Sequence, residues 1–315
     1  MRIRFAAGLA AAAMVVAAAL NAWPARADAA GLSVSYNFLQ NTISAGTKAS
    51  APGENDWTCR PTAAHPNPVV LVHGTGGNAA TNWWTYAALL HNNGYCVYAL
   101  TYGVVPLEAA SPVKVGGIGD ITVSAQELKD FVAKVLASTG ATKVDLIGHS
   151  QGTLMPNYYV RFLGGARFVD HYISLAPLWH GEGGDALGKL AAMRAAYGFS
   201  PDDLVPVCKA CGQMAAGSAF MTKMRTGQIA APGVSYTNIY TRYDDVVFPY
   251  TSGIQTGYAN MKNVLLQSVC ANDFSDHLEI ASSPNAAQIV LNTLDPAHAT
   301  KVKCRLTLPV NGFVF

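Results

Sequence analysis

The stretch Val144-Asp145-Leu146-Ile147-Gly148-His149-Ser150-Gln151-Gly152 decides the fold. The apolar run over 144–147 predicts a strand buried on both faces, and residues 153–163 have the apolar spacing of a helix. The G-x-S-x-G pattern between them is typical of a nucleophile elbow, whose glycines permit a sharp turn that lifts the serine hydroxyl above the sheet. The pattern alone is weak evidence, but a strand before it and a helix after it make it specific. Ser150 is therefore the candidate nucleophile.

The same alternation of strands and helices continues on both sides of this stretch. Short runs of apolar residues alternate with segments of helical periodicity, which predicts an α/β fold with a mostly parallel central sheet flanked by helices. In the helix predicted over 120–138, one apolar stripe should face the core: Val123, Leu128, Phe131, Val132, Val135 and Leu136. The other predicted strands are 69–72, 95–100, 171–175, 234–241 and 263–270, and the other predicted helices are 83–92 and 284–294.

Two segments interrupt the alternation. Residues 28–66 are rich in Ala, Ser, Gly and Pro and contain no long periodic segment. Residues 177–233 combine short helical patterns with several Gly and Pro residues, which indicates an insertion or lid within the domain. The sequence thus predicts a single domain over 28–315 with an insertion at 177–233.

The first 27 residues have the pattern of a secretory signal peptide. Arg2 and Arg4 precede an apolar run over 5–20, and Ala25-Arg26-Ala27 is an A-x-A cleavage site. The alternative is an uncleaved membrane anchor, but the run is shorter than the ~20 residues that a spanning helix needs. We therefore expect a protein that is secreted to the periplasm or the extracellular medium. Cleavage removes three Arg and no acid, so Lys+Arg falls from 21 to 18 against 19 Asp+Glu, a net charge near −1.

Composition excludes two classes of protein. Charged residues make up 13% of the chain and apolar residues 50%, whereas a typical soluble domain is about 25% charged. A disordered chain needs low hydrophobicity and high net charge, so that class is excluded. The near-neutral charge also argues against a nucleic-acid partner, because binding phosphates requires a basic face.

Six cysteines fit an oxidising compartment: Cys59, Cys96, Cys208, Cys211, Cys270 and Cys304. The sequence allows 15 pairings, and the clustering suggests Cys59–Cys96, Cys208–Cys211 and Cys270–Cys304. Cys208-Lys-Ala-Cys211 has an alternative interpretation as a redox C-x-x-C motif, although such motifs open a helix after a strand and this one lies in an irregular stretch. No second Cys or His cluster completes a zinc site.

A serine nucleophile needs a base, and the base needs an acid to orient it. In the strand–elbow–helix context these follow in the order Ser, Asp or Glu, His. Asp244 follows the strand at 234–241 and is the first choice for the acid, with Asp245 second. His277 follows the last predicted strand and is the candidate base, whereas His298 fits the order but lies beyond the closing helix.

The oxyanion of a tetrahedral intermediate needs backbone N–H donors. One donor is expected from Gln151, directly after the nucleophile, and one from the loop after the first buried strand. That loop reads His73-Gly74-Thr75-Gly76-Gly77-Asn78, and Thr75 is the candidate donor, with a hydroxyl that could add a second bond. A phosphate cradle is the alternative for this loop, but it lacks the Lys-Ser/Thr of a P-loop and the G-x-G-x-x-G spacing.

These motifs in combination resemble a known family. The chain is similar to the secreted bacterial lipases of the α/β-hydrolase superfamily called lipase class 2 and, more distantly, to the yeast enzyme lipase B. The resemblance covers roughly residues 55–306. The segments that carry it are 72–77, 148–152, 208–214, 232–238, 243–247 with Pro249-Tyr250, and Cys270 followed by His277.

The resemblance implies an α/β-hydrolase fold and assigns the roles of the candidate residues. It implies Ser150, Asp244 and His277 as the catalytic triad and Thr75 and Gln151 as the oxyanion donors. It also supports the pairs Cys59–Cys96 and Cys270–Cys304. Members of the family act on carboxylic esters without a metal, so we expect no cofactor and no metal ion.

The sequence therefore predicts a secreted serine ester hydrolase, most specifically a triacylglycerol lipase that acts through an acyl-enzyme on Ser150. The expected partner is an ester or lipid substrate at a lipid–water interface, and we expect a monomer. Trp83, Trp84, Trp179 and Phe248 favour an apolar acyl groove, with core packing as the alternative for each. The other functions considered are a short-chain carboxylesterase, a polyester hydrolase, a non-catalytic binding module on a hydrolase scaffold, and a redox protein using the C-x-x-C motif.

Overall fold

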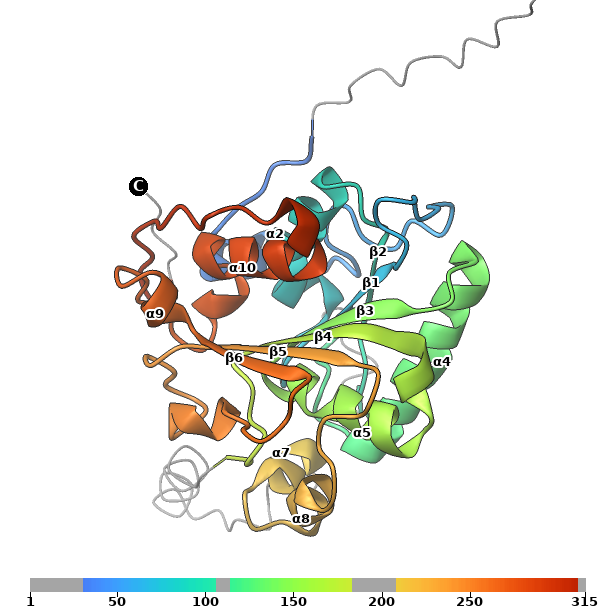
Figure 1. The fold of residues 1–315 in the computed structure, drawn as a ribbon, viewed down its shortest axis with the longest axis vertical. Coiled ribbons are helices and arrows are strands. Elements are labelled where there is room, and N and C mark those ends of the chain that lie inside the picture. The colour runs from blue at the N-terminus through green and yellow to red at the C-terminus, as the bar shows by residue number, and fades with distance from the viewer. Residues whose placement is uncertain (1–30, 106–113, 183–207, 311–315) are drawn as a thin grey trace, which may run out of the picture. The chain divides into compact units, whose positions relative to one another are not determined.

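The computed structural model describes residues 31–105, 114–182 and 208–310. In this part of the chain a central sheet of six parallel strands has the order β2-β1-β3-β4-β5-β6 (Figure 1). The predicted α/β class and the parallel sheet are confirmed. The strands are β1 Val69–Val72, β2 Val97–Leu100, β3 Val144–His149, β4 Val169–Leu175, β5 Ser235–Tyr240 and β6 Met261–Leu265.

The central strands are buried on both faces, as their continuous apolar runs predict. In β1, Val70 and Val72 belong to one core cluster, whereas Val69 and Leu71 belong to the other. The chain moves from β1 outward to β2 and then from β3 outward to β6 on the opposite side. The strand order therefore reverses between β1 and β3. The carboxyl ends of strands at such a reversal form the crevice in which open α/β sheets bind ligands.

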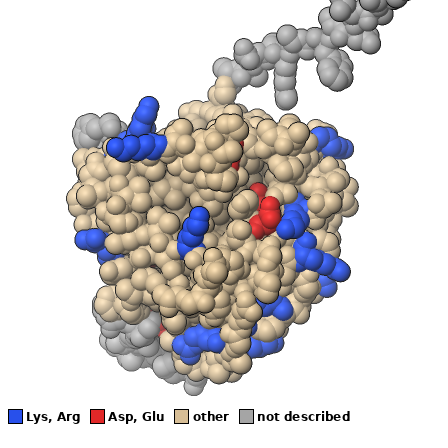
Figure 2. Space-filling view, viewed as in Figure 1, with Lys and Arg blue, Asp and Glu red and all other residues tan. Residues whose placement is uncertain are grey.

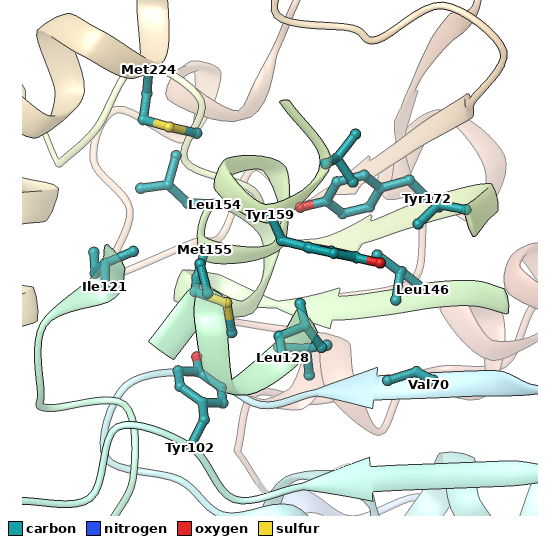
Figure 3. Close-up of a cluster of buried hydrophobic side chains, with 14 of the residues drawn as sticks. Val70, Tyr102, Ile121, Leu128, Leu146, Leu154, Met155, Tyr159, Tyr172 and Met224 are labelled. Atoms are coloured by element: carbon teal, nitrogen blue, oxygen red, sulfur yellow. The ribbon is translucent and has the colours of Figure 1, made fainter. Parts of the chain in front are cut away.

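Helices cover both faces of the sheet. Figure 1 shows α2 and α10 on one face and α4 and α5 on the other. On the second face, Leu128 of α4, Leu146 of β3 and Tyr159 of α5 lie together in the core (Figure 3). The covering helices are α2 Ala79–Asn92, α4 Ile121–Thr139, α5 Met155–Phe162 and α10 Pro284–Leu294. In α4, Val123 is 58% exposed rather than part of the apolar stripe, because residues 121, 125, 128, 132 and 135 form the buried face.

The last predicted strand is wrong in its second half. Residues 263–270 do not form one strand, because β6 ends at Leu265 and helix α9, Leu266–Val269, begins at the next residue. The side chain of Gln267 explains the turn: its Nε2 donates to Thr241 Oγ1 at 2.8 Å and to Asp273 O at 2.9 Å. These bonds lie outside the sheet ladder, and the local sequence of residues 263–270 gives no sign of them.

Helix α1, Phe38–Ala45, lies in the segment for which the sequence predicts no periodic structure. Its N-cap is Asn37, whose side chain accepts a hydrogen bond from Gln40 N at 2.8 Å. The predicted insertion at 177–233 contains α7, Lys209–Met214, and α8, Ala219–Arg225. Residues 183–207 of this insertion lie outside the described residues, as does the predicted signal peptide at 1–27.

All six cysteines form disulfides, in the three pairs that the clustering suggests: Cys59–Cys96, Cys208–Cys211 and Cys270–Cys304. The C-x-x-C motif opens helix α7, with Cys208 at the N-cap, so the expectation that it lies in an irregular stretch is wrong.

Charged side chains are sparse on the surface. Figure 2 shows Lys, Arg, Asp and Glu scattered over one face, most of which is formed by other residues. This agrees with the charged content of 13%. Among the described residues, no helix is both long and apolar enough to cross a bilayer.

Candidate active site

The turn after β3 holds Ser150 in a strained conformation. Ser150 has φ +54°, in the left-handed region that non-glycine residues rarely adopt. A Cβ on Gly148 would lie 1.8 Å from Gly152 O, and one on Gly152 would lie 2.0 Å from Val72 O, so both positions require glycine. The chain continues through a 3-10 turn, Ser150–Thr153, into α5. The structure thus confirms the strand–turn–helix context in which G-x-S-x-G acts as a nucleophile elbow.

Three of the predicted site residues form one hydrogen-bonded chain. Ser150 Oγ lies 2.9 Å from His277 Nε2, and His277 Nδ1 lies 2.9 Å from Asp244 Oδ1 and 3.0 Å from Asp244 Oδ2. The three side chains come from the ends of β3 and β5 and from the loop after α9, and all three are buried. The carboxylate of Asp244 is itself fixed, because it accepts hydrogen bonds from Val246 N and Val247 N.

The second-choice residues lie elsewhere. Asp245 accepts a hydrogen bond from the backbone N–H of His277 at 3.4 Å and does not reach the imidazole ring in the structure. His298 is exposed and bonds to Asp295, so it is not in the chain with Ser150. The structure therefore favours Asp244 over Asp245 and His277 over His298.

The electrostatic environment keeps His277 basic. Burial alone would lower the pKa of His277, but the charge and hydrogen bond of Asp244, together with the charges of Asp245 and Asp276, outweigh it. The pKa of His277 is consequently raised above its ordinary value of 6.5. A neutral His277 with its proton on Nδ1 donates to Asp244, and its Nε2 then accepts the Ser150 hydroxyl proton.

The candidate oxyanion loop lies beside Ser150 at the point where the strand order reverses. It connects β1 to α2, whose N-cap Asn78 accepts from Thr81 N at 2.9 Å. Thr75 Oγ1 donates to Gln151 Oε1 at 2.8 Å, so the side chains of the two predicted donors are joined. The pair therefore links the loop after β1 to the turn after β3.

Sequence reasoning missed a segment that supports this loop. Gly76 N donates to Gly116 O at 2.9 Å, and Gly116 N donates to Gly77 O at 2.8 Å. Gly117, with φ +69°, donates to Tyr102 O at 2.7 Å. This segment meets the oxyanion loop only in the tertiary structure. The glycines at 116 and 117 do not indicate in the sequence that they contact this loop.

His149 is a second residue that the pattern could not identify, because the x of G-x-S-x-G accepts many residue types. Its Nε2 lies 2.7 Å from His277 O, and its Nδ1 lies 3.1 Å from Asn82 Oδ1. Asn82 Oδ1 also accepts from Gly74 N at 3.1 Å. His149 thus connects the backbone of His277 to the oxyanion loop, and burial, together with the charge of His277, lowers its pKa to about 3.

A cavity of about 510 Å³ contains Ser150 and His277. None of the four aromatic residues proposed for an acyl groove lines it: Trp83 and Trp179 are buried in the core, Trp84 packs against the core, and Phe248 is 53% exposed. The polar lining residues include Asn78, Thr81, Asn82, Lys114 and Glu182. The large apolar side chains that line the cavity are Phe38, Val115, Leu178, Met214, Val246, Val247 and Leu278.

One cluster of metal-ligand residue types occurs among the described residues, namely Asp145, Asp170 and His171. It lies at the amino ends of β3 and β4, whereas Ser150 follows the carboxyl end of β3. Its atoms already have partners, since His171 Nδ1 lies 2.9 Å from Asp145 Oδ1 and Lys143 Nζ lies 3.1 Å from Asp170 Oδ1. This cluster is not part of the chemistry at Ser150.

Comparisons with known proteins identify the family of the chain. The model of the lipase (class 2) family matches residues 66–290. A triacylglycerol lipase of Pseudarthrobacter phenanthrenivorans is 37% identical over 101 residues, which cover 30% of this chain and 28% of that protein. Lipase B of Pseudozyma antarctica is 25% identical over 208 residues, which cover 64% of this chain and 54% of that protein. The matched part is thus about a quarter to about half the length of these curated relatives.

Solved structures share the fold. Lipase B of Aspergillus fumigatus has a TM-score of 0.59 at 19% identity, covering 81% of this chain and 57% of that one. The mature lipase BlEst2 of Bacillus licheniformis has a TM-score of 0.51 at 16% identity, covering 75% of this chain and 94% of that one. The family model covers most of the chain and includes Ser150, Asp244 and His277. The protein therefore belongs to the lipase (class 2) family and has the α/β-hydrolase fold.

Proposed function

We propose that the protein is a serine ester hydrolase and that its substrates are triacylglycerols or related esters with apolar acyl chains. The observation that carries this proposal is the hydrogen-bonded chain Asp244–His277–Ser150 inside a cavity with apolar walls. A buried serine that is bonded to a raised-pKa histidine has the arrangement required for nucleophilic catalysis. The family membership supports the same reaction class.

In the acylation step, Ser150 Oγ attacks the ester carbonyl carbon while His277 Nε2 takes the hydroxyl proton. The carbonyl oxygen becomes an oxyanion, which the backbone N–H groups of Thr75 and Gln151 stabilise. When the C–O bond to the alcohol breaks, His277 returns its proton to the leaving oxygen. Asp244 keeps the imidazole in the required tautomer and stabilises its charged form. The products are a free alcohol and an acyl group bound to Ser150.

In the deacylation step, a water molecule takes the place of the alcohol. His277 removes one proton from this water as it attacks the acyl carbon, and the same oxyanion donors stabilise the second tetrahedral intermediate. Collapse of the intermediate releases the carboxylic acid, and the proton on His277 passes to Ser150 Oγ. The step consumes one water, regenerates the free enzyme, and requires no further co-reactant.

Exposed apolar side chains near the cavity support a lipid–water interface as the physical form of the substrate. Val246 and Leu278 line the cavity and are also exposed at the surface. Leu39 and Ile43 are exposed on α1, the helix whose Phe38 and Thr42 line the same cavity. Grouped apolar side chains at the mouth of a site are typical of surfaces that bind other apolar surfaces.

The test is a series of rates on p-nitrophenyl esters from C2 to C16 and on an emulsified long-chain triglyceride. Ser150→Ala should lower kcat by about 10⁴-fold or more, whereas Ser138→Ala, on α4 and away from the site, should retain wild-type rates. Activity confined to C2–C6 would indicate a short-chain esterase, and activity on polyester films alone a polyester hydrolase. A folded wild-type protein inactive on every ester would refute the proposal and favour a binding module.

We also propose that residues 1–27 are removed on export and that the mature protein is a monomer. Three disulfides support an oxidising compartment. N-terminal sequencing of the exported protein should begin at Asp28, and light scattering should give the mass of one mature chain. A cell-associated protein that still carries residues 1–27 would contradict the cleavage.

A further inference from the structure

Helix α1 reaches the catalytic cavity although it lies outside the part of the chain that the family model matches. The model matches 66–290, whereas α1 spans Phe38–Ala45. The side chains of Phe38 and Thr42, one helical turn apart, both line the cavity that contains Ser150. The alternation of strands and helices begins only at β1 and does not account for this helix.

Buried polar contacts fix α1 beside the catalytic histidine. Phe38 N donates to Glu279 Oε2 at 3.0 Å, and Glu279 is two residues after His277. Asn41 Nδ2 donates to Thr85 Oγ1 of α2 at 3.0 Å. These bonds join α1 both to the loop that carries His277 and to the helix that follows the oxyanion loop. Because a helix held at two such points has little freedom to shift, the Phe38 ring has a defined place in the cavity wall.

The side of the cavity that α1 occupies follows from the ring contacts. The Phe38 ring centroid lies 6.4 Å from that of His149, and the His149 ring lies 5.0 Å from the His277 ring. Phe38 is therefore on the His277 side. Leu178 and Met214 belong to the core cluster on the opposite face of the sheet, where Ala210 N of α7 donates to Ile118 O at 3.3 Å. The cavity thus has two walls of separate origin.

The chemistry assigns a different part of the substrate to each wall. The leaving alcohol oxygen receives its proton from His277 Nε2, so the alcohol portion has to lie on the side of His277. The acyl portion extends the other way from the carbonyl carbon, toward Met214 and Leu178. We propose that α1 is the wall of the leaving-group site and that Phe38 determines which alcohols the enzyme accepts. This inference rests on the proposed ester hydrolysis.

The experiment compares two substrate series on Phe38→Ala and on wild type. The alcohol series keeps a butyrate acyl group and runs from methanol to bulky secondary alcohols, and the acyl series keeps p-nitrophenol and runs from C2 to C10. Removing the phenyl ring should change the kcat/KM ratio of bulky to small alcohols by about tenfold or more. The ratios of the acyl series should stay within about twofold.

Three other variants complete the design. Gln40→Ala changes an exposed polar neighbour on the same helix that does not line the cavity, and both ratios should stay at their wild-type values. Met214→Ala, on the opposite wall, should change the acyl ratios and leave the alcohol ratios nearly constant. Phe38→Leu, a smaller change of volume, should shift the alcohol ratios in the same direction as Phe38→Ala and keeps the test valid where the alanine variant unfolds.

The outcomes separate this inference from the proposed function. An inactive wild type refutes the ester hydrolysis itself. An active wild type whose alcohol ratios are unchanged by both Phe38 variants refutes the role of α1. An equal change in both series would also refute it, because a general loosening of the site would affect acyl and alcohol portions alike.

Discussion

Replacing Gly117 by alanine should slow ester hydrolysis although Gly117 contacts no reacting atom. An alanine Cβ at this position would lie 2.9 Å from Gln151 Oε1 and 3.1 Å from Thr75 Cα. Ordinary van der Waals contact begins near 3.4 Å, so these groups have to move by several tenths of an ångström. Thr75 and Gln151 carry the two proposed oxyanion donors. The substitution therefore displaces the backbone of Thr75 without removing its N–H donor, whereas it meets Gln151 only at the end of the side chain.

The expected magnitude follows from the strength of such donors. Complete loss of one oxyanion donor lowers kcat by about 10²–10³-fold, and a misplacement of about 1 Å costs on the order of 10²-fold. A displacement of a few tenths of an ångström should thus lower kcat by about 10- to 100-fold. KM should change little, because the oxyanion is stabilised in the transition state and not in the ground state. The left-handed φ of Gly117 adds a stability loss of about 1–2 kcal/mol for any L-residue.

Gly140→Ala is the matched control for this loss of stability. Gly140 has φ +74°, close to the +69° of Gly117, but a Cβ there meets no heavy atom within 4 Å. In urea, Gly140→Ala should lose the unfolding free energy that the left-handed φ costs, and Gly117→Ala should lose at least as much because of its additional contacts. Only Gly117→Ala should lose kcat on p-nitrophenyl butyrate. An alkylboronic acid forms a tetrahedral adduct on serine, and Gly117→Ala should bind this inhibitor more weakly than Gly140→Ala does. Equal kcat values in the two variants would refute the proposed support of the oxyanion loop.

Three further predictions use pH and covalent links. The acid limb of kcat/KM should have a midpoint above 6.5, because Asp244 and its acidic neighbours outweigh burial and raise the pKa of His277, and only the neutral imidazole can accept the serine proton; a midpoint near 6 would contradict this. Burial raises the pKa of Glu279 from 4.5 to about 9, so the folded state binds the proton more tightly than the unfolded state. The contribution of Glu279 to the unfolding free energy is therefore fully present below pH 4.5 and is lost as the pH rises toward 9, by up to about 1.4 kcal/mol per pH unit. In urea unfolding, Glu279→Gln should show a flatter dependence of the unfolding free energy on pH than wild type. Parallel pH profiles of the two proteins would contradict this. Replacing Cys59 and Cys96 by serine opens a link with a sequence separation of 37 and should lower the unfolding free energy by about 4 kcal/mol in the chain-entropy model, which a fall below 1 kcal/mol would contradict.

The sequence predicted the parts of the fold whose signals are local. Continuous apolar runs identified β1 and the strand before Ser150, because a strand buried on both faces has no polar alternation. The helix over 284–294 has the predicted bounds, since Ser283 caps it and Pro284 occupies its first turn. The order of acid and histidine after the serine also pointed to Asp244 and His277, which the structure joins to Ser150 by hydrogen bonds. In each case the residues that form the sequence pattern are also the residues that determine the local structure.

The features that the sequence did not predict depend on distant contacts. Helix α1 has eight residues, too few to be stable alone, and its bonds to Glu279 and Thr85 join residues 241 and 44 positions apart. Likewise, Gly117 contacts Gln151 and Thr75 only after folding. The aromatic residues expected in an acyl groove fill the core or lie at the surface instead, because residue type alone does not specify which cavity a side chain faces.

Chemistry and selectivity have separate structural origins in this chain. Of the residues proposed for bond breaking, Ser150 and Asp244 follow parallel strands and His277 lies in the loop after α9. The reversal between β1 and β3 brings the oxyanion loop and Ser150 together. The proposed walls of the cavity come from α1, which precedes β1, and from α7, inside the insertion at 177–233. A change in either wall can alter the substrate without moving a strand end. Similarity to other lipases is therefore more informative about the type of reaction than about which alcohol or acyl chain the substrate carries. The alcohol series and the acyl series are the measurements that determine this selectivity.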